Sequence, residues 1–187
     1  WFGDIPSGEK YNRKLPVEPK QTEARRMTVH RNVPMDAIYK TWHMCARRDE
    51  DYYATDLLTD ILGGGASSRL YQSLVKEQQL FANINCYHFG SLDKGLLTIE
   101  GQLIHGVDIE KAEAAIELEL DKVRKDLLDD RELQKVKNKT ESVMAFEDMS
   151  LMNRAASLAY YELLGDAAMM NTELEKYNTV TAEDILK

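Results

Sequence analysis

The stretch of sequence that decides the fold is Leu62-Gly63-Gly64-Gly65-Ala66-Ser67-Ser68-Arg69-Leu70-Tyr71. Ahead of it, residues 51–62 carry apolar side chains at helical spacing, which predicts an amphipathic helix. The three glycines are expected to end this helix, because glycine adopts the left-handed conformation that a helix end requires. A second helix is predicted from Arg69 to about Glu77, and the hydroxyl of Ser67 or Ser68 is its candidate cap.

Two strands are predicted after this stretch and two before it. Downstream, residues 80–89 and 96–103 are strand-like, and residues 91–95 are expected to form the turn between them. Upstream, residues 24–31 and 37–45 alternate between two side-chain faces, as expected of strands with one solvated face.

The second half of the chain is predicted to be mostly helical. One helix runs from about Ile109 to Leu128 with Asp108 as its cap, and a longer helical region covers residues 130–164. The longer region is expected to break near residues 146–150, because an unbroken helix of that length is unusual. This order predicts an α+β fold, in which a mainly antiparallel sheet is covered on one face by helices.

The composition excludes several classes of protein. The chain has 187 residues and a formal net charge of -8, so the phosphate backbone of a nucleic acid is not an expected partner. No apolar run approaches the roughly 20 residues that a membrane span needs. Two cysteines do not make a disulfide framework.

Few residues are candidates for metal ligands. No two of the four histidines have the spacing that places two ligands on one helix face. A site built from both cysteines and two histidines is geometrically conceivable, but structural zinc sites usually show closely paired ligands. The cysteines are therefore interpreted as small core residues. The residues concerned are Cys45, Cys86, His30, His43, His88 and His105.

The triple glycine does not have the pattern of a phosphate loop. Such a loop follows a strand and ends in Gly-Lys-Ser or Gly-Lys-Thr, whereas here a helix precedes the glycines and Arg69 stands alone. The chain also lacks the Gly-x-Ser-x-Gly turn of serine hydrolases. On its residues alone, the sequence assigns no catalytic, metal-binding or substrate-binding residue.

The central stretch resembles the second domain of the insulinase/pitrilysin family of zinc metallopeptidases, which includes the mitochondrial processing peptidase and many bacterial relatives. The pattern is Leu-Gly-Gly-Gly-x-Ser-Ser-Arg-Leu-Tyr-Gln-x-Leu, then a short charged helix, a strand, and Asp93-x-Gly95-Leu96 leading into another strand. Three further segments agree with the family in order and spacing: Phe2-Gly3-Asp4-Ile5-Pro6, Ala159-Tyr160-Tyr161-Glu162-Leu163-Leu164-Gly165 and Thr181-Ala182-Glu183-Asp184-Ile185.

This resemblance implies a curved antiparallel sheet with helices on one face. In the family, two such domains form a half, and two halves close around an unfolded peptide. Zinc sits in the first domain of the catalytic half, on an inverted His-x-x-Glu-His helix. This chain has no such helix, so the resemblance implies that it carries no zinc ligand, no catalytic glutamate and no other cofactor, with zinc expected in the first domain.

A departure from the family pattern concerns substrate binding. In the half that faces the zinc, an Arg and a Tyr seven residues later hold the substrate. The matching positions here are Val75 and Ala82, or Lys76 and Asn83 after a one-residue shift. The resemblance therefore implies the second domain of the zinc-bearing half, whose partner half brings the Arg and Tyr. The opposite possibility is a non-peptidase homologue, like the core subunits of the respiratory complex that share this fold.

Three hypotheses follow. The first is a non-catalytic domain of a zinc metallopeptidase, which shapes the peptide chamber and part of the interface with a second half or homologous subunit. The second is a structural or binding homologue with no peptidase activity in the parent protein. The third, an unrelated small enzyme, is disfavoured by the missing site. The candidate chamber wall is the strand at residues 81–89, whose polar face consists of Asn83, Asn85 and Tyr87.

The two ends of the chain suggest a domain cut from a longer protein. Residues 1–21 have no sustained period and are interpreted as an interdomain linker, followed by the domain at residues 22–187. A short helix is predicted at residues 172–177. Thr181 then has the pattern of a helix cap, but only residues 185–187 follow. We therefore expect the family's last strand to be absent, which would leave an open sheet edge.

Overall fold

The computed structural model describes residues 3–9, 14, 16, 19–90 and 92–187. The chain divides into two compact units, residues 1–32 and residues 33–187, which are described separately. Phe2 of the linker motif and Ser91 of the predicted turn lie outside the described residues. Within the ranges given, no helix has both the length and the apolar content that crossing a membrane requires.

The first unit corrects one prediction. Residues 24–31 were expected to form a strand, but the structure assigns them no strand, and every one of them is exposed. The reason lies in the side chains. Met27 and Val29 share their face with Arg25 and Arg31, so neither face is apolar enough to be buried against a core.

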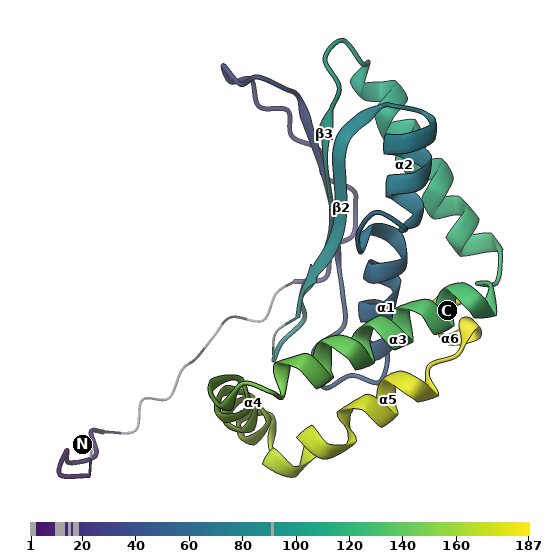
Figure 1. The fold of residues 1–187 in the computed structure, drawn as a ribbon. Coiled ribbons are helices and arrows are strands. Elements are labelled where there is room, and N and C mark those ends of the chain that lie inside the picture. The colour runs from purple at the N-terminus through teal and green to yellow at the C-terminus, as the bar shows by residue number, and fades with distance from the viewer. Residues whose placement is uncertain (1–2, 10–13, 15, 17–18, 91) are drawn as a thin grey trace. The chain divides into compact units, whose positions relative to one another are not determined.

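The second unit contains a three-stranded antiparallel sheet with the order β1-β3-β2. The strands are β1 (Ala37–His43), β2 (Phe81–Phe89) and β3 (Leu96–Leu103). In register, Tyr39 of β1 and Asn85 of β2 both lie opposite Glu100 of the central strand. The helices lie on one face of this sheet (Figure 1), which confirms the predicted α+β class.

The helical segments of the second unit follow the predicted order. The break in the long helical region falls after Glu147, and the next helix begins at Leu151. The described segments are α1 (Tyr52–Gly63), the π-helix η1 (Tyr71–Glu77), α2 (Ile109–Lys125), α3 (Asp130–Glu147), α4 (Leu151–Leu164), the 3-10 helix η2 (Ala167–Thr172), α5 (Glu173–Thr179) and α6 (Ala182–Leu186).

The triple glycine ends α1, as predicted, and also allows that helix to approach the sheet. Gly65 adopts a φ of 104°, in the left-handed region. At Gly63, an added Cβ would lie 1.9 Å from the backbone nitrogen of Cys86 in β2. The Ser68 hydroxyl does not cap the next helix. It donates a hydrogen bond to the carbonyl of Gly65, which closes the glycine turn instead.

Side-chain caps fix the starts of several helices. Asp108 Oδ1 accepts a hydrogen bond from the Lys111 backbone amide at 2.8 Å, and Ser150 similarly caps α4. Thr181 and Asp184 form a reciprocal capping box at the start of α6. The caps predicted at Asp108 and Thr181 are thereby confirmed.

We expect the Asp108→Ala variant to lose about 1 kcal/mol of unfolding free energy, because the Lys111 amide loses its hydrogen-bond acceptor. Urea unfolding followed by circular dichroism measures the change. The matched control is Asp36→Ala, an exposed aspartate just ahead of β1. Equal destabilisation by the two substitutions would contradict the capping role.

Two apolar clusters hold the second unit together. The first lies between the sheet, η1 and α2, and includes Phe81, Ile99 and Ile116, which are fully buried. The second joins α1 to α3, α5 and α6. Leu58 and Leu97 pack against both clusters, so the helices and the sheet share one continuous interior. The opposite face of the sheet carries no part of either cluster.

Candidate functional site

The face of the sheet opposite the helices is the candidate functional surface, and we call it the open face. Strand alternation directs Ile38, Cys86 and Ile99 toward the helices, where all three are buried. Their neighbours along each strand point the other way. The open face consists of Tyr39, Thr41, His43, Asn83, Asn85, Tyr87, Phe89, Leu96, Thr98, Glu100 and Gln102.

A carboxylate and two tyrosines occupy the centre of the open face. The Tyr87 hydroxyl donates to Glu100 Oε2 at 2.9 Å, and the Tyr39 hydroxyl donates to Glu100 Oε1 at 3.4 Å. The hydrogen bond to Glu100 holds the phenolic proton and raises the pKa of Tyr87. The three side chains come from three different strands, so the sheet register positions them.

One end of the open face is apolar and accessible. Phe89 is 62% exposed and Leu96, its neighbour in register, is 40% exposed. The rings of Tyr87 and Phe89 meet edge to face, with centroids 5.4 Å apart. The aromatic surface therefore continues from the central carboxylate to this end.

The residues considered for a metal site are not brought together. His43 lies on the open face, whereas Cys86 points into the core beside Gly63, and burial raises its pKa to about 12. Cys45 lies after β1, with its Sγ 3.7 Å from the Thr55 hydroxyl. His105 is exposed after β3, and His30 is exposed in the first unit. Among the described residues, no three His, Cys, Asp or Glu side chains gather to hold a metal ion.

The positions that match the family's substrate clamp do not form one here. Val75 packs against the first core cluster, and Lys76 lies over the Tyr71 ring at 5.7 Å. Ala82 and Asn83 are exposed at the start of β2, where the register with β3 shifts. These residues offer neither a guanidinium nor a phenol to a bound peptide.

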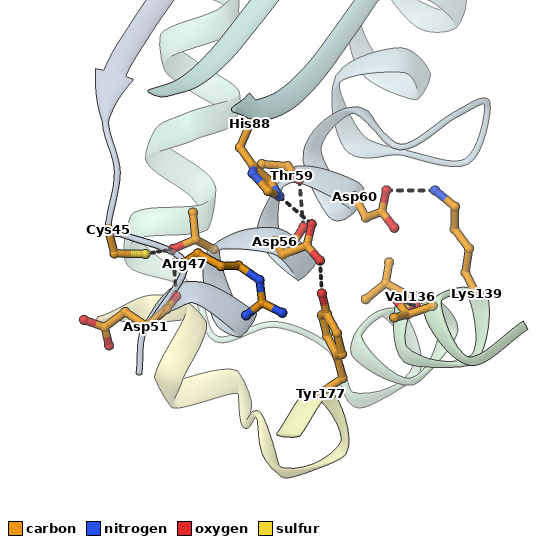
Figure 2. Close-up of polar contacts among 12 residues, drawn as sticks. Cys45, Arg47, Asp51, Asp56, Thr59, Asp60, His88, Val136, Lys139 and Tyr177 are labelled. Atoms are coloured by element: carbon orange, nitrogen blue, oxygen red, sulfur yellow. Dashed lines mark hydrogen bonds and ion pairs between the residues drawn. The ribbon is translucent and has the colours of Figure 1, made fainter. Parts of the chain in front are cut away.

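A half-buried histidine forms part of a polar cluster between the sheet and the C-terminal helices (Figure 2). His88 Nε2 lies 2.7 Å from Asp56 Oδ1, and the Tyr177 hydroxyl donates to the other Asp56 oxygen. Burial alone would raise the pKa of Asp56, but the hydrogen bonds from His88 and Tyr177 outweigh it and keep the pKa below its usual value. The cluster joins β2, α1 and α5, so it has a structural role.

A second buried cluster ties α5 to α1. Arg47 and Glu173 form an ion pair, with side chains 5% and 3% exposed. The Tyr53 hydroxyl donates to Glu173 Oε2 at 3.0 Å, and the Arg47 guanidinium lies 4.3 Å from the Tyr52 ring centroid. The charged and hydroxyl groups of Arg47, Glu173 and Tyr53 are hydrogen-bonded to one another. This mutual pairing is typical of a structural cluster, not of a site that meets a substrate.

A groove on the covered side runs between β1, α1, α2 and α6, with a volume of about 500 Å³. Its walls are mainly apolar and include Trp42, Leu58 and Leu120. Asp51, Arg124 and Lys187 are among the charged residues that line it. Because its walls are mainly apolar, this groove has the character of a packing surface.

The comparisons with known proteins agree on a family of peptidase domains. A family model described as the peptidase M16 inactive domain matches residues 1–140. A search of curated proteins found no match.

Several solved structures share the fold. A protease from Helicobacter pylori gives a TM-score of 0.78 at 21% identity, over 84% of this chain and 38% of that one. The inactive peptidase domain of a candidate zinc protease from Bordetella parapertussis gives a TM-score of 0.74 at 21% identity, over 86% of this chain and 87% of that one. A chain of complex III2 from Candida albicans gives a TM-score of 0.61 at 13% identity, over 83% of this chain and 39% of that one. This chain thus spans well under half of the Helicobacter protease.

Proposed function

We propose, because this chain belongs to the family of peptidase M16 inactive domains, that it serves as a non-catalytic domain of a zinc metallopeptidase. In this proposal it forms one wall of the chamber that holds an unfolded peptide. It also supplies part of the surface that meets the other half of the enzyme. Zinc and the catalytic glutamate belong to another domain of the parent protein.

The single observation that carries the proposal is the open face of the sheet. Nine of its eleven residues have a polar side chain, and Tyr39 and Phe89 are more than 60% exposed. A sheet face destined for a core would instead carry apolar residues at these alternating positions. A broad surface with aromatic and amide side chains suits an extended peptide, which needs both apolar contacts and hydrogen-bond partners.

The proposed interface rests on the end of α3 and on α4, which we call the α4 surface. Leu164 is the one buried residue of α4, although the helix is rich in apolar residues. The large apolar side chains exposed on the α4 surface are Val143, Phe146, Met149, Leu151, Met152, Leu158, Tyr160 and Leu163. Exposed apolar side chains in this number on neighbouring helical segments favour a protein contact. The occupant we propose is a second half of the same family, since the Helicobacter relative is more than twice as long as the aligned region.

A second candidate function is that of a structural homologue whose parent protein has no peptidase activity. The likeness to a chain of complex III2 favours it, because that assembly contains the same fold. The parent sequence distinguishes the two candidates. The peptidase proposal requires an inverted zinc motif in a neighbouring domain, and the structural alternative does not.

Peptide mapping by nuclear magnetic resonance tests the chamber wall. We expect an unfolded peptide to shift the amide signals of open-face residues such as Thr41, Thr98 and Glu100. Amides of α2 that face the core, such as Ile116, should stay unchanged and provide the internal control. Shifts confined to the helical side would contradict the proposed wall.

A further inference from the structure

Glu100 has an unusual position at the centre of the open face. It lies on the central strand, and the hydroxyls of Tyr39 and Tyr87 donate to its two carboxylate oxygens. Both donors are neutral, so the negative charge is hydrogen-bonded but not neutralised. The two phenol rings stand beside a charge that a mobile ligand can approach from solvent.

The other charged residue of the three strands points away from this surface. β1, β2 and β3 contain one carboxylate, Glu100, and one lysine, Lys40. Lys40 lies on the helical side, where its Nζ contacts Glu113 at 2.9 Å and Glu117 at 2.8 Å. The open face therefore presents a single negative charge framed by aromatic rings.

We propose that Glu100, Tyr39 and Tyr87 form a subsite for a lysine or arginine side chain of an extended peptide on the open face, an inference that rests on the proposed function. The cation would pair with the carboxylate, and its methylene stem and charge would lie against the phenol rings. Aromatic faces attract cations, and the stem of a long basic side chain packs well on a ring.

The apolar end of the open face adds a second requirement. Leu96 precedes Glu100 by four residues on β3, a distance of about 13 Å at the usual strand rise. An extended peptide aligned with β3 has the same rise. A basic side chain at Glu100 therefore places the residue four positions away over Leu96 and Phe89, where an apolar side chain fits.

The experiment uses two synthetic peptides and the full 187-residue chain. One peptide carries an arginine and, four positions away, a phenylalanine. The other has glutamine in place of the arginine. Amide shifts of Thr98 and Glu100 during titration give both affinities. We expect the arginine peptide to bind about tenfold more tightly, from one exposed ion pair and one cation–π contact, with the advantage falling as salt is added.

Variants assign the preference to individual side chains. Glu100→Gln is expected to equalise the two affinities, and Tyr39→Leu to reduce the preference by about threefold. Glu117→Gln, which removes a carboxylate from the helical side, is the matched control and should keep the full preference. If a variant fails to fold, the unchanged protein still tests the subsite. The ratio of its affinities for the arginine and glutamine peptides, and the fall of that ratio with added salt, then give the answer.

The outcomes separate this inference from the proposed function. Binding of both peptides to the open face with equal affinity would overturn the basic subsite and leave the chamber wall standing. Binding of neither peptide to this face would overturn both. A preference for arginine that survives in Glu100→Gln would also overturn the subsite.

Discussion

Replacement of Gly63 by alanine is expected to destabilise the second unit by at least about 3 kcal/mol. The new Cβ would lie 1.9 Å from the backbone nitrogen and 2.7 Å from the Cα of Cys86. Because these are backbone atoms, no side-chain rotation can relieve the overlap, and α1 would have to move away from β2. Alanine is favoured over glycine within a helix by at most about 1 kcal/mol, which does not offset the clash.

Chemical denaturation of the Gly63→Ala variant measures this effect. Gly8→Ala is the matched control, because a Cβ at Gly8 meets nothing within 4 Å. The control should unfold at the same denaturant concentration as the unchanged chain. A Gly63→Ala variant of normal stability would show that α1 and β2 are not in direct backbone contact.

Replacement of Arg47 by alanine is expected to cost about 3–5 kcal/mol of unfolding free energy. The carboxylate of Glu173 is 3% exposed and would lose its positive partner while staying buried. The burial of Arg47 opposes its charge, but the hydrogen bond to Tyr53 and the charge of Glu173 more than compensate, and the pKa of Arg47 is raised. Removal of Arg47 therefore leaves the negative charge of Glu173 buried without its positive partner.

A double substitution tests whether the ion pair itself or the unpaired charge sets this cost. In Arg47→Met with Glu173→Leu, no charge remains buried, so most of the stability should return. Lys125→Ala provides the matched control, since its ion pair with Asp121 is exposed and should contribute little. A double variant as unstable as Arg47→Ala would contradict the account of Glu173 as a buried, unpaired charge.

The local features of the fold could be predicted from sequence because local chemistry determines them. β3 spans Leu96–Leu103, as its alternation predicted, and α2 begins after its Asp108 cap. The long helical region breaks between Glu147 and Leu151, within the predicted interval. In each case a turn residue, a cap or a hydrophobic period acts over a few residues.

The strand expected at residues 24–31 was wrong for a physical reason. Alternation alone does not make a strand, since a strand also needs a neighbour and an apolar face to bury. Arg25 and Arg31 flank Met27 and Val29 on the same face, and the two guanidinium charges favour keeping that face in contact with solvent. The segment from 37 onward succeeds because Ile38 and Trp42 pack against the core.

The buried polar clusters could not be predicted from sequence, because their members are far apart in the chain. Arg47 and Glu173 are separated by 126 positions, and Asp56 and Tyr177 by 121. Each residue alone resembles an ordinary surface residue of a loop or helix. One signal was present, since Glu173 lies four residues before Tyr177, so the two side chains share one face of a helix, and both are buried.

The candidate surface was partly predictable. The period of β2 placed Asn83, Asn85 and Tyr87 on one face, and the structure agrees. Glu100 was not singled out, because its importance depends on the register that sets Tyr39 opposite to it and Tyr87 diagonal to it. Strand register is a tertiary property, so a single strand does not encode it.

Our central proposal is that this domain contributes a surface to proteolysis but not the chemistry. Zinc calorimetry, combined with a peptide-cleavage assay of the purified chain with and without a chelator, tests that claim most directly. His43 and His88 lie on different strands, and His30 and His105 lie outside the helices and strands. No two of them have the helical spacing around a glutamate that a zinc peptidase site requires. We therefore predict no tight zinc binding and no cleavage. Stoichiometric zinc binding with chelator-sensitive cleavage would contradict the account and place the active site within these 187 residues.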